Sequence, residues 1–269
     1  MRYRGLLILA FMLLGHGMST ALALEWKGQA IQGGLLTGYV DSGANVEALG
    51  QSISVMEDGR FLLGLGREAP AELDVVVIKP NGDRQNYLLS IEQRDYDIQR
   101  IDGLPDSQVT PDEQTLQRIR AEAARVRAAR EQRFDTPFFD TGWIWPVTGP
   151  ITGVYGSQRI LNGQPRQPHY GIDIAAATGT PVKAPADGVV TLVEPDLFFS
   201  GGTLIVDHGH GLSSSFLHLA SIDVELGQRV QRGDTIATVG ATGRVTGAHL
   251  DWRMNWFDQR IDPTLVLNQ

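Results

Sequence analysis

The first half of the chain alternates between short apolar runs and residues that favour turns. Between residues 25 and 96, two turn segments stand out, Asp58-Gly59 and the Pro-Asn-Gly-Asp stretch at 80–83. Alternation with a period of two is typical of strands that bury one face, and an Asp-Gly pair favours a type I′ hairpin turn, whose two central residues need positive φ. The pattern predicts a small β-sandwich with two hairpins, one joining strands 52–56 and 61–65, the other joining strands 74–78 and 86–91.

The apolar spacing then changes to three and four residues over positions 111–133, which predicts a helix. Thr110 as N-cap, Pro111 as the first helical residue and Glu113 three positions after the cap form a capping box. The predicted apolar stripe consists of Leu116, Ile119, Ala123 and Val126. The other faces are rich in arginine, so we expect a linker helix that packs by one edge on the next domain. Contact with an anionic surface such as the cell wall or lipid headgroups is the alternative.

The remainder of the chain again has the pattern of a β protein. Its apolar runs are punctuated by glycine and proline and predict strands at 188–193, 203–207, 213–219, 235–239 and 249–255. The chain is therefore mainly β, with an N-terminal β domain at 24–98, a linker with a helix at 99–140 and a second β domain at 141–269.

The first 23 residues are expected to be a secretory signal peptide. Arg2 and Arg4 form a basic region, positions 6–14 form an apolar run, and Ala21-Leu22-Ala23 fits the small-x-small cleavage pattern. The run is too short to span a membrane, and no later stretch approaches about 18 apolar residues, so we expect no integral membrane span after cleavage. An uncleaved membrane anchor is the alternative.

Composition narrows the class of protein further. The 269 residues include no cysteine, which excludes disulfides and thiolate metal sites, and export without disulfides indicates a protein of the bacterial envelope or periplasm. A net charge of -8 argues against nucleic acid as a partner, because phosphate binding needs a basic face.

Five of the six histidines lie between His169 and His249. On an extended segment, His169, Gly171 and Asp173 share one face, and the glycine leaves space for an ion. On the strand at 249–255, His249 and Asp251 share one face while Leu250 turns to the core. On the strand at 213–219, alternation places Phe216 and His218 on one face.

If these faces line one groove, the sequence offers three metal ligands and two imidazoles for proton transfer. That set matches a hydrolytic zinc (Zn²⁺) site, with three protein ligands, an open position for water and groups that move protons. A surface histidine with a solvated aspartate is the alternative for the 169–173 pair taken alone.

Several segments resemble signature blocks of the LytM-type (lysostaphin-like) zinc metallopeptidases. The blocks are His169-x-x-x-Asp173, Asp207-His208-Gly209, Phe216-Leu217-His218-Leu219 and Gly243-x-x-x-Gly247-Ala248-His249-Leu250-Asp251. The resemblance covers residues 141–269, and the preceding region resembles the N-terminal β domain of exported envelope members. It implies an antiparallel β fold with an open groove, zinc as the cofactor, and cleavage of peptide stems or cross-links of peptidoglycan.

Carried over residue by residue, the resemblance makes His169 and Asp173 zinc ligands, and His218 and His249 the catalytic imidazoles. The sequence departs from the family at Asp251, where a histidine usually supplies the third ligand. An aspartate Oδ1 is as many bonds from its Cα as a histidine Nδ1, so we hypothesise that Asp251 is the third ligand and that the enzyme is active. This replacement changes the charge of the site, because two carboxylates make the zinc site formally neutral. The additional oxygen ligand also makes the preference for zinc over manganese less secure.

Other polar residues near these blocks have simpler interpretations. We expect hydrogen-bonded structural roles for His208 and His210 rather than metal ligation. The serines at 213–215 lack a nucleophile-elbow motif, which argues against a serine hydrolase. Arg159 and Asn162 could contact substrate carboxylates or serve ordinary loop roles.

Two functional hypotheses follow. The first is a zinc endopeptidase that acts on peptidoglycan peptides. The second is a catalytically inactive relative whose groove binds or activates a cell-wall amidase. In either case the N-terminal domain could contact another envelope protein, because it contains no cluster of candidate site residues of its own.

Overall fold

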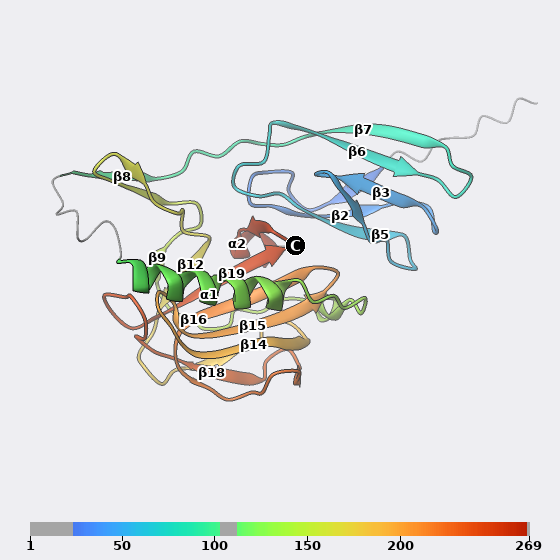
Figure 1. Ribbon diagram of the computed structural model, residues 1–269. Coiled ribbons are helices and arrows are strands. Elements are labelled where there is room, and N and C mark those ends of the chain that lie inside the picture. The colour runs from blue at the N-terminus through green and yellow to red at the C-terminus, as the bar shows by residue number, and fades with distance from the viewer. Residues whose placement is uncertain (1–23, 103–111, 268–269) are drawn as a thin grey trace, which may run out of the picture.

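The computed structural model of the chain describes residues 24–102 and 112–267. The expected signal peptide at 1–23 lies outside this part of the chain. Figure 1 shows a mainly β protein in which an N-terminal pair of sheets lies over a larger C-terminal sheet, with one long helix alongside. Within the described residues, no helix has the length and apolar character needed to cross a membrane.

The N-terminal sandwich contains two antiparallel sheets. The first has the strand order β1-β2-β5 and the second the order β4-β3-β6-β7. Their bounds are β1 Glu25–Lys27, β2 Leu35–Tyr39, β3 Asn45–Ala48, β4 Gln51–Ile53, β5 Arg60–Gly64, β6 Glu72–Ile78 and β7 Arg84–Ser90.

The second predicted hairpin is confirmed and the first is wrong. Strands β6 and β7 pair antiparallel over their full lengths. Strand β4 pairs with β3, whereas β5 pairs with β2 in the other sheet, so the chain crosses between sheets at Asp58-Gly59. Of these two residues only Gly59 has a positive φ, at 83°, so a type I′ turn does not form.

The C-terminal sheet has ten strands and the main order β17-β14-β15-β16-β19-β12-β9. All five predicted strands are present, as β14 Gly188–Leu197, β15 Gly201–Gly209, β16 Leu212–Ile222, β18 Thr235–Val239 and β19 His249–Trp256. The sheet also contains β9 Ile151–Gly153, β12 Gly171–Ala175, β13 Pro181–Lys183, β17 Arg229–Val230 and β20 Gln259–Ile261. A short helix, α2 Pro263–Val266, follows the last strand.

The linker helix α1 spans Glu113–Arg130 and lies along β14. Its N-cap is Asp112, which accepts a hydrogen bond from the Thr115 N–H, so the cap is not the predicted Thr110, which like Pro111 lies outside the described residues. Ala123 is exposed, and the face turned to the sheet instead contains Glu122 and Ala129. Glu122 is tolerated there because its carboxylate accepts hydrogen bonds from the Phe198 N–H and from the Arg118 side chain.

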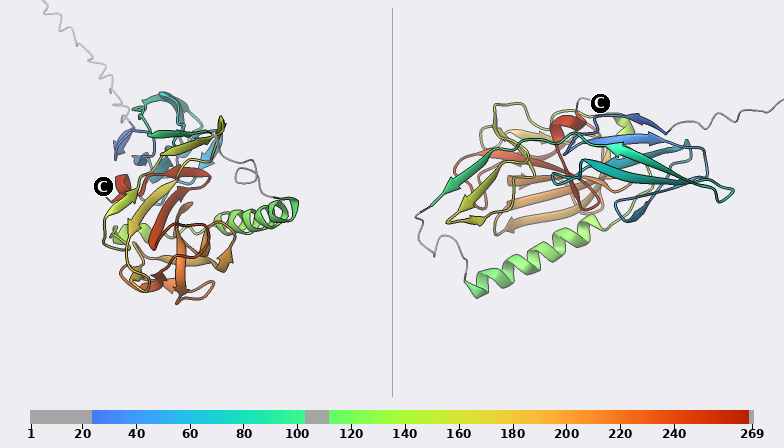
Figure 2. Two further views of the ribbon diagram at one scale, coloured as in Figure 1. Left: turned by 90° about the vertical axis from the view of Figure 1, so that its left-hand side faces the viewer. Right: turned by 90° about the horizontal axis from the view of Figure 1, so that it is seen from above.

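The linker also contributes a strand before the helix. Strand β8 (Ile98–Ile101) pairs in parallel with β10 (Gln158–Leu161), which forms a hairpin with β11 (Gln164–Pro165). Figure 2 shows this small sheet and α1 on different sides of the C-terminal domain. The linker therefore touches the C-terminal domain in two separate places.

The two halves of the molecule share one apolar core. Strand β5 contacts β19 and β20, and a Cβ added to Gly64 would lie 2.6 Å from the Cβ of Trp256. At the edge of this contact, Arg94 forms an ion pair of 2.9 Å with Asp262, and the Asp262 N–H donates to the Gly33 carbonyl. The N-terminal sandwich is thereby packed firmly against the end of the chain.

Candidate active site

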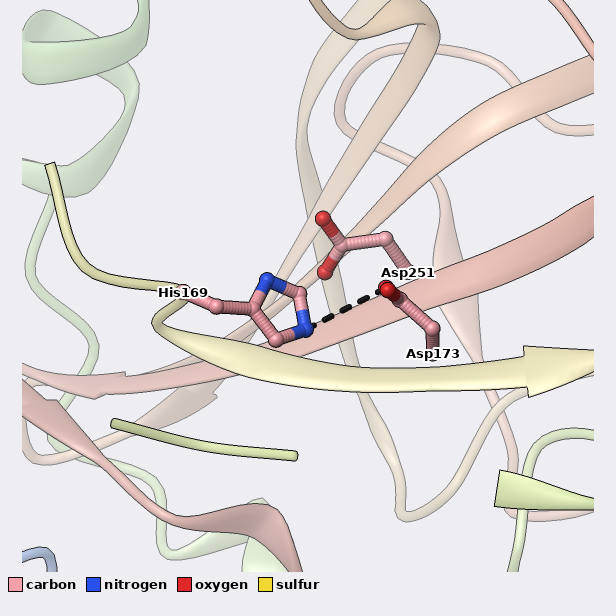
Figure 3. A group of neighbouring side chains, drawn as sticks. All are labelled: His169, Asp173 and Asp251. Carbon is pink, nitrogen blue, oxygen red and sulfur yellow. Dashed lines mark ion pairs between the residues drawn. The ribbon is translucent and has the colours of Figure 1, made fainter. Parts of the chain in front are cut away.

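Two carboxylates meet across neighbouring strands of the C-terminal sheet. In the register of β12 and β19, Asp173 lies directly opposite Asp251, so the two side chains project from the same face. His169 comes from the segment before β12, and its Nε2 lies 3.2 Å from Asp173 Oδ1 (Figure 3). One ligand atom from each of the three residues lies within 4.8 Å of the others.

His169 is not part of a strand, so the prediction that it alternates with Gly171 and Asp173 on one strand is only partly right. Its backbone is fixed instead by the loop that precedes β10. The His169 N–H donates to the Ser157 carbonyl, and the His169 carbonyl accepts from the Gly156 N–H. These two bonds hold the imidazole in reach of the aspartates.

The donor atoms of this cluster fit a divalent metal ion. His169 Nε2 and Asp173 Oδ1 are both buried, and neither has a hydrogen-bond partner in the part of the chain that the structure describes. Buried polar atoms without partners are costly, and a shared cation would satisfy both. Their separation of 3.2 Å matches the roughly 3.3 Å between neighbouring ligands of tetrahedral zinc.

Asp251 has a charged partner that was not among the predicted site residues. Arg253 Nε lies 3.0 Å from both carboxylate oxygens of Asp251, and Arg253 Nη2 lies 2.5 Å from Oδ2. Burial by itself would raise the pKa of Asp251, but the charge and hydrogen bonds of Arg253 outweigh it and lower that pKa below its usual value. Asp251 is therefore ionised and held in one orientation.

Two glycines make room for this arrangement. A Cβ on Gly171 would lie 2.5 Å from Arg253 Cγ and 2.7 Å from Asp251 Oδ1. The expectation that Gly171 leaves space for an ion is thus wrong, because the Asp251–Arg253 pair occupies that space. On the neighbouring strand β9, a Cβ on Gly153 would collide with the Asp173 carboxylate.

The two candidate catalytic histidines lie side by side. The ring centroids of His218 and His249 are 4.9 Å apart, and His249 Nε2 is 3.7 Å from Asp173 Oδ1. Each Nδ1 lies 2.9 Å from a backbone carbonyl, that of Thr242 for His218 and that of Gly247 for His249. Because a carbonyl oxygen can only accept, Nδ1 carries the proton in both rings, and Nε2 of a neutral ring keeps its lone pair.

The environment of His218 keeps its ring neutral. Burial lowers the pKa of His218 below its ordinary value, so the imidazole is uncharged at pH 7. His218 also has a positive φ, at 65°, which is uncommon for a residue with a side chain. At this point the register of β15 and β16 shifts by one residue between the pairs Gly202↔Leu219 and Leu204↔Phe216.

This β-bulge corrects one prediction from the sequence. Regular alternation predicts that Phe216 and His218 share a face, but Phe216 is fully buried opposite Trp252 in the core. The neighbouring pair is Leu217 opposite Asp251, which is the face of the metal cluster. The extra residue turns His218 to that same face, beside Leu217.

The other two histidines differ from each other. His208 is fully buried, and its ring nitrogens bond to the Asp187 carbonyl at 2.7 Å and to Ser214 Oγ at 2.9 Å, which confirms a structural role. His210 packs edge-on against Phe139, and neither ring nitrogen finds a hydrogen bond among the described residues. The hydrogen-bonded role expected for the His210 side chain is therefore wrong.

Three arginines extend the cluster, Arg130 from α1, Arg253 from β19 and Arg260 from β20. Arg130 Nη2 donates to Ser215 Oγ at 3.0 Å, and Arg260 Nη1 donates to Asn255 Oδ1 at 3.0 Å. Burial, together with the charges of Arg260 and Arg253, lowers the pKa of Arg130 well below its usual value. Burial and Arg253 likewise lower the pKa of Arg260, to about 10.

Strand alternation could have identified Arg253, which follows Asp251 by two residues on one strand. No pattern in the sequence connects Arg130, which lies on α1, with either residue. Arg159 lies on β10, the strand that pairs with β8, and Asn162 lies in the turn that follows β10. Their contact with substrate stays a prediction.

Comparison with known proteins places these residues in a family. The model of "Peptidase family M23" matches residues 167–263, which include all five candidate site residues. A crystal structure of a family M23 peptidase from Pseudomonas aeruginosa is 31% identical, covers 89% of this chain and 95% of its own, and superposes with a TM-score of 0.69. The similarity thus includes the N-terminal half as well as the candidate site.

Two curated relatives match over the C-terminal part. Peptidoglycan DD-endopeptidase ShyC of Vibrio cholerae is 42% identical over 129 residues, which are 48% of this chain and 26% of the relative. A metalloprotease of Haemophilus influenzae is 33% identical over 143 residues, which are 53% of this chain and 27% of the relative. The chain spans about a quarter of the length of these relatives. The matched residues, the β architecture and the near-complete overlap with the Pseudomonas structure establish that this chain belongs to peptidase family M23.

Proposed function

We propose that this protein is a zinc-dependent endopeptidase that hydrolyses peptide cross-links or stems of bacterial peptidoglycan. The observation that carries the proposal is the meeting of His169, Asp173 and Asp251, with two buried donor atoms that lack partners within the described chain. The substrate is supported by the Vibrio cholerae relative, which is a peptidoglycan DD-endopeptidase. A protein that acts on such a substrate would work in the cell envelope, where the expected signal peptide would direct it.

In this proposal, His169 Nε2, Asp173 Oδ1 and one oxygen of Asp251 would hold the metal. Zinc, when bound, lowers the pKa of a water molecule and polarises the scissile carbonyl group. His218 contributes a neutral ring whose Nε2 can take a proton from the attacking water, because its Nδ1 is committed to the Thr242 carbonyl. After protonation, that ring can return the proton to the leaving amine.

His249 is positioned to stabilise negative charge on the scissile oxygen. Its Nδ1 is anchored to the Gly247 carbonyl, and its Nε2 points towards the Asp173 side of the cluster. A protonated Nε2 at this place would donate a hydrogen bond to the developing oxyanion. The bonds to backbone carbonyls orient both imidazoles relative to the cluster.

Arg253 offsets the charge that Asp251 adds to the site. Zinc with one histidine and two carboxylates is formally neutral, whereas zinc with two histidines and one carboxylate has a charge of +1. The Arg253 guanidinium, bound to both oxygens of Asp251, restores +1. An ionised carboxylate has about four lone-pair positions, so Asp251 can bind Arg253 on one side and a metal on the other.

The ion pair with Arg253 is also the observation that favours an inactive relative, because the guanidinium competes for the oxygens of Asp251. In that case the groove would bind or activate a cell-wall amidase without hydrolysis. One experiment separates the two functions. The purified protein is assayed for metal by mass spectrometry and is incubated with cross-linked peptidoglycan, and the soluble fragments are then identified.

The proposed enzyme should contain about one zinc per chain and release new peptide fragments, and a chelator followed by added zinc should abolish and restore this activity. Asp173→Ala is the inactive control. Bound zinc without new fragments would favour the regulator. Unchanged zinc content and hydrolysis in Asp251→Ala would show that Asp251 is not a ligand.

A further inference from the structure

We propose that Arg130, Arg253 and Arg260 form a cationic subsite that binds a carboxylate of the substrate peptide, next to the metal cluster. The inference rests on the proposed peptidase function and deepens it, because it names a chemical feature that the substrate must have. We call these three residues the arginine subsite.

The arginine subsite continues the face that holds the metal cluster. His249, Asp251, Arg253 and Asn255 alternate onto one face of β19. In the sheet, Arg253 lies opposite Gly171 of β12 and Ser215 of β16. Two residues along a strand span about 7 Å, so the backbone of Arg253 lies about two extended substrate residues away from that of Asp251.

Arg130 reaches this face from the last turn of α1. Its Nη2 donates to Ser215 Oγ, and Ser215 is the residue paired with Arg253. Its Nε is buried and finds no acceptor within the described residues. A half-buried guanidinium whose hydrogen bond goes to a neutral hydroxyl is destabilising, and a bound anion would offset that cost.

The charges in this region do not balance without a ligand. Among the described residues, Arg253 pairs with Asp251, whereas Arg130 and Arg260 bond to the neutral side chains of Ser215 and Asn255. The ring of Tyr170 lies 5.5 Å from the Arg260 guanidinium carbon and is also uncharged. Two positive charges therefore remain without a carboxylate partner.

The ligand that best fits is a planar carboxylate. Guanidinium groups bind carboxylates through paired N–H donors, and the side chain of Arg253 is 24% exposed, so the subsite is open to solvent on one side. A peptide in the groove would present such a group if it carried a free carboxylate close to the scissile bond. The same peptide with an amide at that position would leave the arginines uncompensated.

Binding of two small peptides to metal-free protein tests this directly. The probes are N-acetyl-D-alanyl-D-alanine as the free acid and as its C-terminal amide, titrated into chelator-treated protein and followed by NMR. Removing the metal prevents the carboxylate from binding to zinc instead. We expect the acid to bind about tenfold more tightly than the amide, since a hydrogen bond to a charged group contributes about this much.

The variants make the assignment specific. Arg130→Gln and Arg260→Gln should each reduce the preference for the acid to less than threefold. Arg127→Gln removes an exposed arginine from the same helix, one turn earlier, and should keep the full preference. Equal binding of acid and amide by the wild-type protein, or an undiminished preference in Arg130→Gln, would refute the arginine subsite.

Thermal unfolding separates ligand binding from a purely structural role. Arg130→Met removes a half-buried charge that has no counter-ion among the described residues, so its Tm should equal or exceed that of the wild type. A lower Tm would mean that the guanidinium holds the fold together, and would count against the proposal. None of these measurements needs hydrolysis, so a failure of the peptidase assay leaves them interpretable, and a failure here leaves the peptidase function standing.

Discussion

Asp251 and Arg253, two residues apart on β19, form a bidentate ion pair at the third corner of the metal cluster. If Arg253 maintains the charge of the site, its removal should affect chemistry more than folding. In Arg253→Gln, zinc should bind more tightly because a neighbouring positive charge is lost, while water in the site becomes less acidic. The acidic limb of the pH profile of kcat should move to higher pH by about one unit.

Arg253→Lys is the matched control for that experiment, because it keeps the charge and loses the bidentate geometry. Its acidic limb should stay close to that of the wild type. Identical pH profiles and zinc affinities in Arg253→Gln and the wild type would mean that the ion pair has no part in the site. Zinc affinity is measured by competition with a coloured chelator.

Gly153→Ala should weaken metal binding although residue 153 is not a ligand. A Cβ at this position would collide with the carboxylate of Asp173, which must then move out of the cluster. Disturbing the support of a ligand typically costs 10–100-fold in metal affinity, and we expect a loss of about this size. Gly247→Ala is the control, since a Cβ there meets nothing within 4 Å and its φ is not positive.

Neighbouring groups in β15 should give opposite pH dependences of stability. Burial raises the pKa of Asp207 from 3.8 to about 6, so its contribution to folding is present below pH 4 and is lost as pH rises through 6. Burial lowers the pKa of His208 from 6.5 to about 4, so its contribution is present above pH 6.5 and is lost as pH falls towards 4. In the wild type, the two opposite changes in the free energy of unfolding with pH largely cancel.

Variants that remove one of the two groups should reveal the pH dependence of stability caused by the other. In Asp207→Asn, the free energy of unfolding should rise between pH 4 and 6.5, and in His208→Gln it should fall over the same interval. Each change should amount to at most about 3 kcal/mol. Urea denaturation at several pH values measures the free energy of unfolding. If this free energy changed with pH in the same way in both variants, the pKa shifts given for Asp207 and His208 would be contradicted.

The N-terminal sandwich should support the metal site through one backbone contact. Arg67 Nε donates to the Gly156 carbonyl at 2.9 Å, and the Gly156 N–H donates to the His169 carbonyl at 2.7 Å. Arg67→Ala leaves a buried carbonyl without its partner, so we expect a loss of about 1–3 kcal/mol in stability and weaker zinc binding. Arg84→Ala breaks an exposed ion pair with Glu47 in the same domain and should change both by little.

The sequence pattern predicts most strands correctly, but it does not predict the irregular backbone that positions two of the site residues. Alternation correctly places His249 and Asp251 on one face and Leu250 in the core, because β19 is a regular strand. It fails at His218, where a β-bulge changes the direction of the side chain, and at His169, which precedes its strand. Bulges and loop conformations depend on tertiary contacts that local patterns do not contain.

Tertiary contacts also explain what the sequence pattern of α1 did not predict. The apolar stripe of α1 predicted Ala123 in contact with the sheet, but Glu122 is buried there because Phe198 and Arg118 bond to its carboxylate. The contact of Arg130 with Ser215 joins residues 85 positions apart, and no periodicity in either segment indicates it. Local sequence patterns therefore predict helices and strands, whereas the arginine subsite can be recognised only once the fold has brought its residues together.

The ion pair between Arg94 and Asp262 joins positions 168 residues apart, close to the end of the described chain. Contacts of this kind close long loops and form late, so folding should be limited by this final closure rather than by either β domain. A nascent chain would leave the face of β5 uncovered until β19 and β20 arrive. A truncation that removes β20 and Asp262 should therefore expose the apolar face of β5 and promote aggregation.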